Sequence, residues 1–386
     1  MGGKYLPARA FNDSGHSSNP AGSVITCYRK RGVGLTIEVI AIKNNREMQA
    51  FDAFPRKIYR NFFRAPSFPA IEWPSQKFSD LLFHAIDAQP FLAFRNGKSV
   101  GRIAVSINHT YDRKETGFFG YFEALDDLDA ASALLKAAAQ WLSDRGISRM
   151  IGPVDLTPHE RLGLLTKGFN GYHLPGMPYN PPYYPDLLVQ LGLETEVTLF
   201  AYRCDLRRPI PERLVRVANR AGLKKDLLLR EINFGDLANE GVIFSKIHNG
   251  SMNAGWGFAP LTPREGSAIW AKIKNFCDPS LIIIAEIDGK PAGLCLILCP
   301  VQKPHYTNLS GRLTARLAVL AVLPQYRLKG LEAAMILECA KRARNKGIGT
   351  LELSQVAENN PMMNRIIQSL GDIRRDREYR IYKSAI

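Results

Sequence analysis

The sequence predicts an α/β chain in which one structural unit occurs twice. Three observations support this fold class. Two hairpins of the same design have turn glycines 192 residues apart, and two helix-to-strand junctions have glycines 201 residues apart. The chain is also long enough for two hydrophobic cores, with 386 residues of which 46% are hydrophobic.

The hairpins are FLAFRNGKSVGRIAVSI in the first half and LIIIAEIDGKPAGLCLIL in the second. Their turns are Asn96-Gly97-Lys98 and Asp288-Gly289-Lys290, and each turn glycine is followed four residues later by Gly101 or Gly293. Asn-Gly and Asp-Gly between apolar runs predict hairpins, because both turn residues must tolerate positive φ.

Each hairpin is followed by a strand and an amphipathic helix. In the first half a strand at Phe118–Phe122 precedes a helix that ends at Gly146, and a strand then runs to Ile151. In the second half the helix ends at Gly347 and a strand runs from Thr350 to Leu353. Apolar residues recur at helical spacing. They are Ala131, Leu134, Leu135, Ala138 and Leu142 in the first helix, and Ala333, Ile336, Leu337 and Ala340 in the second.

The first 34 residues are polar, rich in Gly, Ser and Asn, and carry a basic cluster at Arg29–Arg31. We expect residues 1–34 to be mostly disordered and regular structure to begin near Leu35, where LTIEVIAI alternates like a strand. The segment has no apolar core of the signal-peptide type, and no apolar run is long enough to span a bilayer. The six cysteines form no CxxC. These features predict a cytoplasmic protein with reduced thiols, no metal site and no membrane partner.

The positive charge is concentrated in the second half. The net charge is +4 over residues 1–34, zero over 35–207 and +11 over 208–386. A positive field concentrates anionic ligands such as a nucleotide cofactor, an acidic substrate or nucleic acid. A solvated basic surface without a partner is the alternative interpretation.

The segment LAVLAVLPQYRLKGLEAAMILECA, from Leu317 to Ala340, lies within this basic half. It predicts a buried strand, a break at Pro324, a basic loop ending at Gly330, and a helix. Backbone N–H groups of a tight loop and a helix N-terminus make an anion site, because they lack intrahelical partners. Arg327 and Lys329 add two charges beside it. The pattern therefore predicts a site for a phosphate-bearing ligand.

These residues resemble the pyrophosphate loop of the GNAT superfamily, the acyl-CoA N-acyltransferases. Val322, Leu323 and Pro324 match the strand end, and Arg327, Leu328, Lys329, Gly330 and Leu331 match the first five loop positions. The resemblance implies two tandem GNAT-like domains, each a mixed β-sheet flanked by helices. It also implies that Val322 and Leu323 pair with the pantetheine arm of an acyl-CoA, and that the backbone of Arg327–Leu331 holds its pyrophosphate.

A second part of the resemblance lies in AENNPMMNRIIQSLG. Asn360 and Gly371 fit the ends of the family's fourth-helix pattern, which implies that Asn360 contributes to the cofactor site. Two residues depart from the family's pattern. Glu332 replaces a small residue at the sixth loop position, and Ile367 replaces the tyrosine that protonates the departing thiolate.

The identity of the catalytic acid and base stays open at this point. Water is one alternative proton donor, and Tyr379, Tyr382 and Tyr306 are others. Glu352 and Ser354, at the end of a strand, are suited to orient an amine or a water, although a strand-end polar pair is more often structural.

The first copy lacks the cofactor loop. It has Glu123, Asp126, Asp127 and Asp129 before its helix, with no glycine between them and the helix. Carboxylates cap helix N-termini well and repel a pyrophosphate. We expect a first domain at 35–207 without a cofactor and a second domain at 208–386 with one.

Two further segments are candidates for the walls of a substrate site. Gly168–Pro185, with GYHLPGMPYNPPYYP, predicts a stiff loop with exposed rings at Tyr172, Tyr179, Tyr183 and Tyr184, or a packed seam between the domains. His173, and the His159-Glu160 pair, are polar spots of low specificity. The NAGWGF segment at Asn253–Phe258 predicts an aromatic loop before a helix capped by Thr262, with Pro263 at its first position. In the GNAT fold such a loop borders the acceptor site.

The sequence thus predicts an N-acyltransferase that moves an acyl group, most simply acetyl, from acyl-CoA to the primary amine of an unknown acceptor. Two other functions remain open. One is a non-catalytic binding protein that kept the fold, which Glu332 and Ile367 favour. The other is a tRNA-dependent aminoacyl-transferase, which the basic second half allows because Lys and Arg neutralise RNA phosphates. No RNA-binding motif accompanies it.

Overall fold

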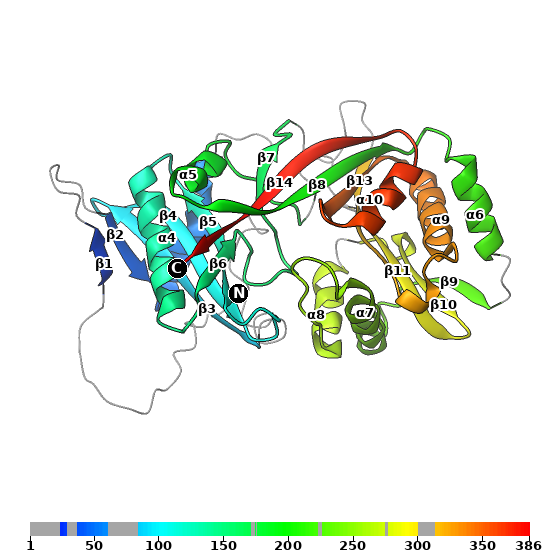
Figure 1. Cartoon of the computed structure of the whole chain (residues 1–386), viewed down its shortest axis with the longest axis horizontal. Coiled ribbons are helices and arrows are strands. Elements are labelled where there is room, and N and C mark those ends of the chain that lie inside the picture. Colours follow the sequence, from blue (N-terminus) through cyan, green and yellow to red (C-terminus); the bar gives the residue numbers. More distant parts are fainter. Residues whose placement is uncertain are drawn as a thin grey trace. The chain divides into compact units, whose positions relative to one another are not determined.

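The computed structural model describes residues 24–28, 37–60, 84–170, 174, 176–222, 226–274, 277–299 and 313–386 (Figure 1). The chain forms two compact units. The first contains Met1–Thr166, Gly176–Val197 and Arg380–Ile386, and the second contains Lys167–Pro175 and Thr198–Tyr379.

This division differs from the two contiguous domains expected at 35–207 and 208–386. The difference arises at the long C-terminal strand β14 (Ile373–Ala385), whose last residues pair antiparallel with β6 (Arg149–Gly152) of the first unit. The end of the chain therefore completes the unit in which the chain begins.

The first unit is a mixed sheet with the strand order β1-β2-β3-β4-β5-β6-β14. All described neighbours are antiparallel except β5 and β6, which are parallel. Its elements are β1 (Val24–Tyr28), β2 (Ile37–Ala41), α1 (Asn45–Ala53), α2 (Pro55–Tyr59), β3 (Ile86–Arg95), β4 (Lys98–Asn108), β5 (Thr116–Ala124), α4 (Leu128–Ser143), β6, β7 (Leu164–Lys167), α5 (Tyr184–Gln190) and the start of β8 (Glu194–Asp205).

Regular structure begins earlier than Leu35, the start expected from sequence. Strand β1 (Val24–Tyr28) lies within the segment expected to be mostly disordered, and it pairs antiparallel with β2. Its sequence VITCY is rich in the β-branched and aromatic residues that favour strands. The polar composition of the surrounding residues favoured the prediction of disorder over this short apolar run.

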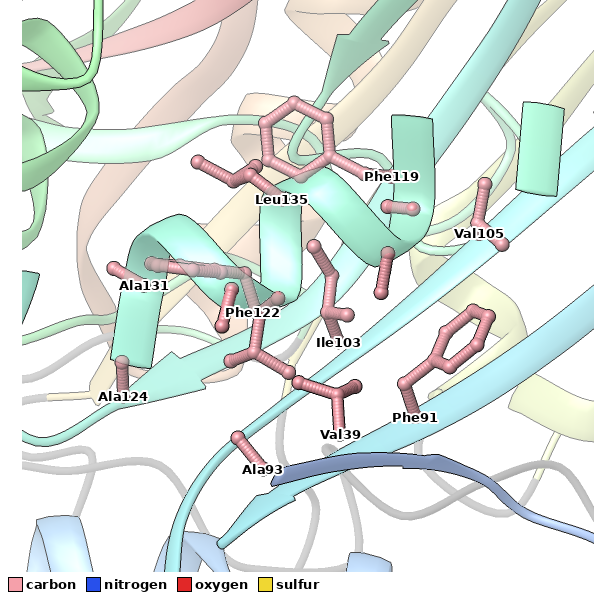
Figure 2. Packing of buried hydrophobic residues seen from close by; sticks show 14 of the residues in the cluster. Val39, Phe91, Ala93, Ile103, Val105, Phe119, Phe122, Ala124, Ala131 and Leu135 are labelled. Atoms are coloured by element: carbon pink, nitrogen blue, oxygen red, sulfur yellow. The ribbon is translucent and has the colours of Figure 1, made fainter. Parts of the chain in front are cut away.

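The core of the first unit lies between its sheet and α4. Figure 2 shows Ala131 and Leu135 of α4 packing among Phe122, Ile103 and Val39 of the strands. All five side chains are buried, as the helical spacing predicts for the α4 residues.

The second unit is a mixed sheet with the order β8-β13-β12-β11-β10-β9. Among the described strand pairs of this unit, only β12 and β13 are parallel. Its further elements are α6 (Glu212–Gly222), β9 (Leu227–Glu231), α7 (Leu237–Met252), α8 (Pro263–Ile273), η2 (Pro279–Leu281), β10 (Ile282–Ile287), β11 (Lys290–Leu298), β12 (Leu313–Val322), η4 (Pro324–Tyr326), α9 (Leu331–Asn345), β13 (Ile348–Ala357) and α10 (Pro361–Ser369).

Helices cover both faces of this second sheet. Alternating residues of β10 enter two different cores: Ile283 packs in the core that contains α9, and Ile282 in the core that contains α7 and α8. Helices α7 and α8 lie side by side, as Figure 1 shows. Glycines allow their close approach, since a Cβ at Gly266 would lie only 2.6 Å from the Gly241 carbonyl oxygen. Helix α6 packs on the outside of α9.

The turn predictions are confirmed. Asn96 and Gly97 have φ of 50° and 72°, and Asp288 and Gly289 have φ of 51° and 68°, as two-residue hairpin turns with right-handed twist require. Gly146 and Gly347, which end α4 and α9, also have positive φ.

The prediction of exposed rings in Gly168–Pro185 is wrong for the three tyrosines that the structure describes. Tyr179 and Tyr184 are buried and Tyr183 is half-buried. Tyr184 opens α5 and donates its hydroxyl proton to the buried Glu123 at 2.8 Å, so the segment packs into the first unit. Tyr172 and His173 lie outside the described residues.

None of the described helices has the length and apolar character needed to cross a bilayer. The cysteines with described side chains, Cys204, Cys277, Cys295, Cys299 and Cys339, are free thiols.

Candidate functional site

In the second unit, two parallel strands separate part-way along their length. Strands β12 and β13 pair from Leu313 to Leu317, where Leu317 lies opposite Leu353. Beyond this point β12 continues beside β11 to Val322, whereas β13 continues beside β8 to Ala357. Ala318, the next residue of β12, is an extra residue in the ladder, because Leu296 pairs with Val319 and Ile297 with Leu317. Such a bulge bends a strand and ends regular pairing.

The separation leaves one edge of β12 without a strand partner among the described residues. The amide of Leu323 donates to the Ala292 carbonyl of β11 at 2.9 Å. Because antiparallel residues alternate between hydrogen-bonded and non-hydrogen-bonded pairs, Val322 and Leu320 point their N–H and C=O groups away from β11. The open edge is therefore formed by Leu320 and by the N–H group of Val322, whose carbonyl accepts from Arg327, and the amide of Leu323 faces the other way.

The loop after β12 presents a series of backbone amides. Leu328 and Gly330 have φ of 59° and 83°, and helix α9 begins at Leu331. None of the described residues accepts a hydrogen bond from the amides of Leu328 through Ala333. Consecutive free N–H groups at a left-handed turn and a helix N-terminus form a concave site for an anion.

The two cations of the loop are bound to backbone oxygens. Arg327 donates from Nε to the Val322 carbonyl at 3.0 Å and from Nη2 to the Ser251 carbonyl at 2.7 Å. Lys329 donates from Nζ to the Gln325 carbonyl at 2.8 Å. These contacts fix the loop between β12 and the end of α7, and they keep both positive charges beside the free amides.

Gly330 allows a close approach of α6 to this loop. A Cβ at this position would lie 3.0 Å from Val217 Cγ1 and 3.1 Å from the Val217 carbonyl oxygen. Leu328, at the tip, is 90% exposed. The loop is thus held by α6 and α7 while its tip stays in solvent.

The remaining predicted site residues have roles within the fold. Asn360 caps α10, where its Oδ1 accepts from the Met363 amide at 3.0 Å. Ile367 is 4% exposed and packs in the core beside α9, so α10 offers no proton donor there. Glu332 Oε2 is buried and has no hydrogen-bond partner among the described residues. Its carboxylate complements the helix dipole of α9.

A buried polar cluster lies where β12 and β13 part. Arg316 of β12 donates from Nε to Ser354 Oγ at 3.1 Å, and Ser354 Oγ donates to Glu352 Oε1 at 2.9 Å. Arg377 of β14 donates from Nη1 to Glu352 Oε2. Arg316 is partly exposed, whereas Glu352 and Arg377 are buried, and Tyr379 of β14 is fully buried. Burial lowers the pKa of Arg316.

Sequence reasoning identified Glu352, Ser354 and Tyr379 separately but missed the two arginines. Arg316 interrupts the apolar strand LTARLAVLAV, and Arg377 alternates with Tyr379 along β14. An arginine inside an apolar strand was the available signal, because a buried charge requires a partner.

The loop at Asn253–Phe258 is fastened to α7. The side chain of Asn249 accepts from the Leu261 amide and donates to the Leu261 carbonyl, both at 2.8 Å. His248 stacks on Phe258 with ring centroids 5.6 Å apart, and burial lowers its pKa. The predicted Thr262 cap is confirmed as a complete capping box with Glu265. His159 and Glu160 lie half-buried in the first unit.

The equivalent place in the first unit is filled by the chain itself. Strands β5 and β6 pair only to Phe118 and Ile151. After β6, the Val154 amide donates to the Phe119 carbonyl at 2.7 Å, and Asp155 Oδ1 accepts from the Tyr121 amide at 2.7 Å.

Residues 249–371, which contain the open edge and the amide loop, match the family model of the acetyltransferase (GNAT) family. A tandem GNAT protein from the clavulanic acid biosynthesis pathway has a similar structure, with a TM-score of 0.56 over 90% of this chain and 98% of that chain, at 12% identity. The chain is a tandem GNAT-fold protein. A GCN5-related N-acetyltransferase from Anabaena variabilis is also similar, with a TM-score of 0.52 at 11% identity, over 90% of this chain and 72% of that one.

Two curated relatives match this GNAT-fold chain over nearly its whole length. One is named bacterial ceramide synthase, from Caulobacter vibrioides, with 28% identity over 379 residues that cover 91% of this chain and 98% of the relative. The other is protein YghO of Escherichia coli, with 29% identity over 382 residues that cover 89% and 94%.

Proposed function

We propose that the second unit binds an acyl-CoA and transfers its acyl group to a primary amine, and that this amine belongs to a long-chain amino alcohol. The observation that carries the proposal is the open β12 edge leading directly into the free amides of Leu328–Ala333. The edge suits the amides of a pantetheine arm, and the loop suits a pyrophosphate. The long-chain acceptor is suggested by the relative named ceramide synthase, since a ceramide is the amide of a fatty acid and a long-chain amino alcohol.

Val322, Leu320 and the backbone from Arg327 to Leu331 would hold the cofactor in this proposal. Asn360 would act through its cap, by fixing the start of α10. In the reaction the amine nitrogen attacks the thioester carbonyl, the new C–N bond forms, the C–S bond breaks, and one proton moves from nitrogen to sulfur. The bulge at Ala318 lies at the apex where the strands part, so backbone donors there are suited to polarise the thioester carbonyl.

We assign no cofactor to the first unit, because its own residues occupy the equivalent edge. The Asp155 carboxylate accepts a hydrogen bond from the Tyr121 amide. At the start of α4, the Asp127 carboxylate accepts one from the Ala130 amide at 3.1 Å. We place the protein in the cytoplasm, where its free thiols remain reduced.

The test is acyl transfer by the purified protein, with acyl-CoA chains from acetyl to stearoyl and with sphinganine, a short primary amine or an amino acid as acceptor. Thiol release and mass spectrometry of the amide follow the reaction. We expect amide formation with sphinganine and a long-chain acyl-CoA. Product from acetyl-CoA and a short amine alone would keep the reaction type and overturn the lipid acceptor.

Calorimetric titration with CoA and acyl-CoA separates the remaining functions. One-site binding without transfer to any acceptor would overturn the enzyme and leave a binding protein, the function that Glu332 and Ile367 favour. Absence of binding would overturn the cofactor site, and co-purifying RNA would then support the tRNA-dependent transferase.

A further inference from the structure

Acyl transfer from a thioester to an amine requires a proton at sulfur as the C–S bond breaks. In this chain α10 provides no donor, because Ile367 is buried in the apolar core beside α9. The donor is then water or a group on another element of the second unit.

Tyr379 has a hydroxyl with no partner. Its side chain is 0% exposed, and its oxygen forms no hydrogen bond with any described residue. A buried hydroxyl without a partner lowers the stability of a fold, and such groups in native proteins are rare. The unsatisfied hydroxyl is explained if its partner is a ligand atom that arrives during turnover.

The position of Tyr379 fits that explanation. Tyr379 follows Arg377 by two residues on β14, and Arg377 Nη1 contacts Glu352 Oε2. Residues two apart on a strand point to the same face. Glu352 is linked through Ser354 to Arg316, one residue before the point at which β12 and β13 stop pairing. Arg316 is partly exposed, so the cluster reaches the surface beside the open edge.

We propose that Tyr379 is the proton-transfer residue of the second unit. Its hydroxyl gives a proton to the departing CoA sulfur and receives one from the nitrogen of the tetrahedral intermediate, so the tyrosine is unchanged after each turnover. The C–N bond is formed and the C–S bond is broken without any other reactant. This inference rests on the acyl transfer proposed above.

The surroundings suit a donor that stays protonated. Burial raises the pKa of Tyr379, and the carboxylate of Glu352 raises it further, while Arg377 and Arg316 lower it. Such a hydroxyl is a weak acid on its own, and it transfers its proton efficiently only when the ammonium of the intermediate returns one at the same time. Tyr382 lies on the same strand but belongs to the first unit, and Tyr306 lies outside the described residues.

The test compares Tyr379→Phe with the native protein and with Tyr382→Phe, a matched removal of a hydroxyl from a buried tyrosine of β14. We expect Tyr379→Phe to lower kcat about 10²- to 10⁴-fold, with an unchanged dissociation constant for acyl-CoA and an unchanged or higher Tm. Tyr382→Phe should keep the native kcat. A kcat for Tyr379→Phe within threefold of native, in a protein that transfers acyl groups, would overturn the assignment alone. Absence of transfer by the native protein overturns the proposed function instead.

A change of leaving group gives a readout that a structural role would not move. An acyl thiophenyl ester expels a more acidic thiol that needs no proton, so it should restore much of the rate of Tyr379→Phe relative to native. An equal deficit with both donors would contradict the proposal. If Tyr379→Phe fails to fold, 3-fluorotyrosine at position 379 keeps the shape and acidifies the hydroxyl. It should change kcat with the CoA thioester more than kcat with the thiophenyl ester, and equal changes with both donors would refute the role.

Discussion

The two units differ most at the strand edge that each leaves after its parallel pair. In the first unit, Val154 and Asp155 follow β6 and bond to the edge of β5, and a Cβ at Gly120 would lie only 2.2 Å from the Val154 carbonyl oxygen. In the second unit the corresponding strand β13 turns to β8, and the edge of β12 stays open. One fold thus supports a closed or an open strand edge, depending on the path of a few residues after one strand.

The N-termini of the helices that follow these edges differ in the same way: the start of α4 is capped by a side chain, and the start of α9 is not. At the start of α4, Asp127 supplies its own carboxylate to the Ala130 amide and forms an ion pair with Arg95 at 2.7 Å. At the start of α9, Gly330 supplies no side chain and the amides remain free. An internal carboxylate in the first unit occupies the position that an external phosphate would take in the second.

The largest expected effect comes from opening the first edge. Asp155→Ala removes the acceptor of the Tyr121 amide and the partner of Arg161, whose side chain is 13% exposed. Leaving a nearly buried charge unpaired costs about 3–5 kcal/mol, so we expect a loss of that size in the free energy of unfolding. The control is Asp87→Ala, which breaks the exposed pair with His109 and should cost at most about 1 kcal/mol. Chemical denaturation measures the free energy of unfolding of both variants. A gain of acyl-CoA binding by Asp155→Ala would show that these residues only block a site on the edge of β5.

Closing the second site tests the other half of the comparison. Gly330→Val and Gly347→Val both place a side chain at positive φ, which costs about 1–2 kcal/mol of stability. Only at Gly330 does the new side chain meet Val217, whereas nothing lies within 4 Å of a Cβ at Gly347. We expect Gly330→Val to weaken acyl-CoA binding at least about 100-fold and Gly347→Val to leave it unchanged. Calorimetric titration measures the acyl-CoA affinity of each variant. Equal affinities for the two variants would show that the loop is not part of the acyl-CoA site.

A smaller effect separates the two helix starts. Asp127→Ala should lower the free energy of unfolding by about 1 kcal/mol, because α4 loses its cap. Asp127→Asn keeps a capping oxygen and should cost less. Neither variant should alter acyl-CoA affinity, and a change in that affinity would contradict a cofactor-free first unit.

The smallest effect is an opposite response of the two units to pH. Burial raises the pKa of Glu123 despite Arg102, so stability from this group is present below its unfolded pKa and is lost as pH rises through the folded value. Burial lowers the pKa of His248, so stability from this group is present above its unfolded pKa and is lost as pH falls through the folded value. Between about pH 4.5 and 6.5, rising pH should lower the protection factors of the α4 amides and raise those of the α7 amides, after division by the intrinsic exchange rate at each pH. Glu123→Gln and His248→Asn should each abolish the response of their own unit, and parallel responses would contradict the assignment.

The parts of the fold that the sequence predicted are those set by short-range geometry. The turns at Asn96-Gly97 and Asp288-Gly289, and the buried faces of α4 and α9, follow from positive φ and helical spacing. The amide loop was predictable for the same reason, since Gly330 and the helix start are adjacent in sequence.

The parts that failed depend on distant residues. The burial of Tyr184 requires Glu123, and the place of the end of β14 in the first unit requires β6. Neither pairing can be predicted from neighbouring residues in the sequence. The cluster of Arg316, Glu352 and Arg377 likewise joins residues from three strands. Periodicity predicts which face of an element is apolar, but it does not predict which distant partner covers that face.

The pairing of the end of β14 with β6 has a consequence for biosynthesis. Residues 380–386 belong to the first unit, where residues 382–385 pair with β6, yet they are translated after every residue of the second unit. At roughly 5–20 residues per second, roughly 10–40 seconds separate the synthesis of Val197 from that of Arg380. During this interval the first unit lacks its last strand, and the edge of β6 that β14 covers stays unpaired. The unit made first is therefore completed last, and a chaperone that shields this edge in the meantime would raise the yield of folded protein.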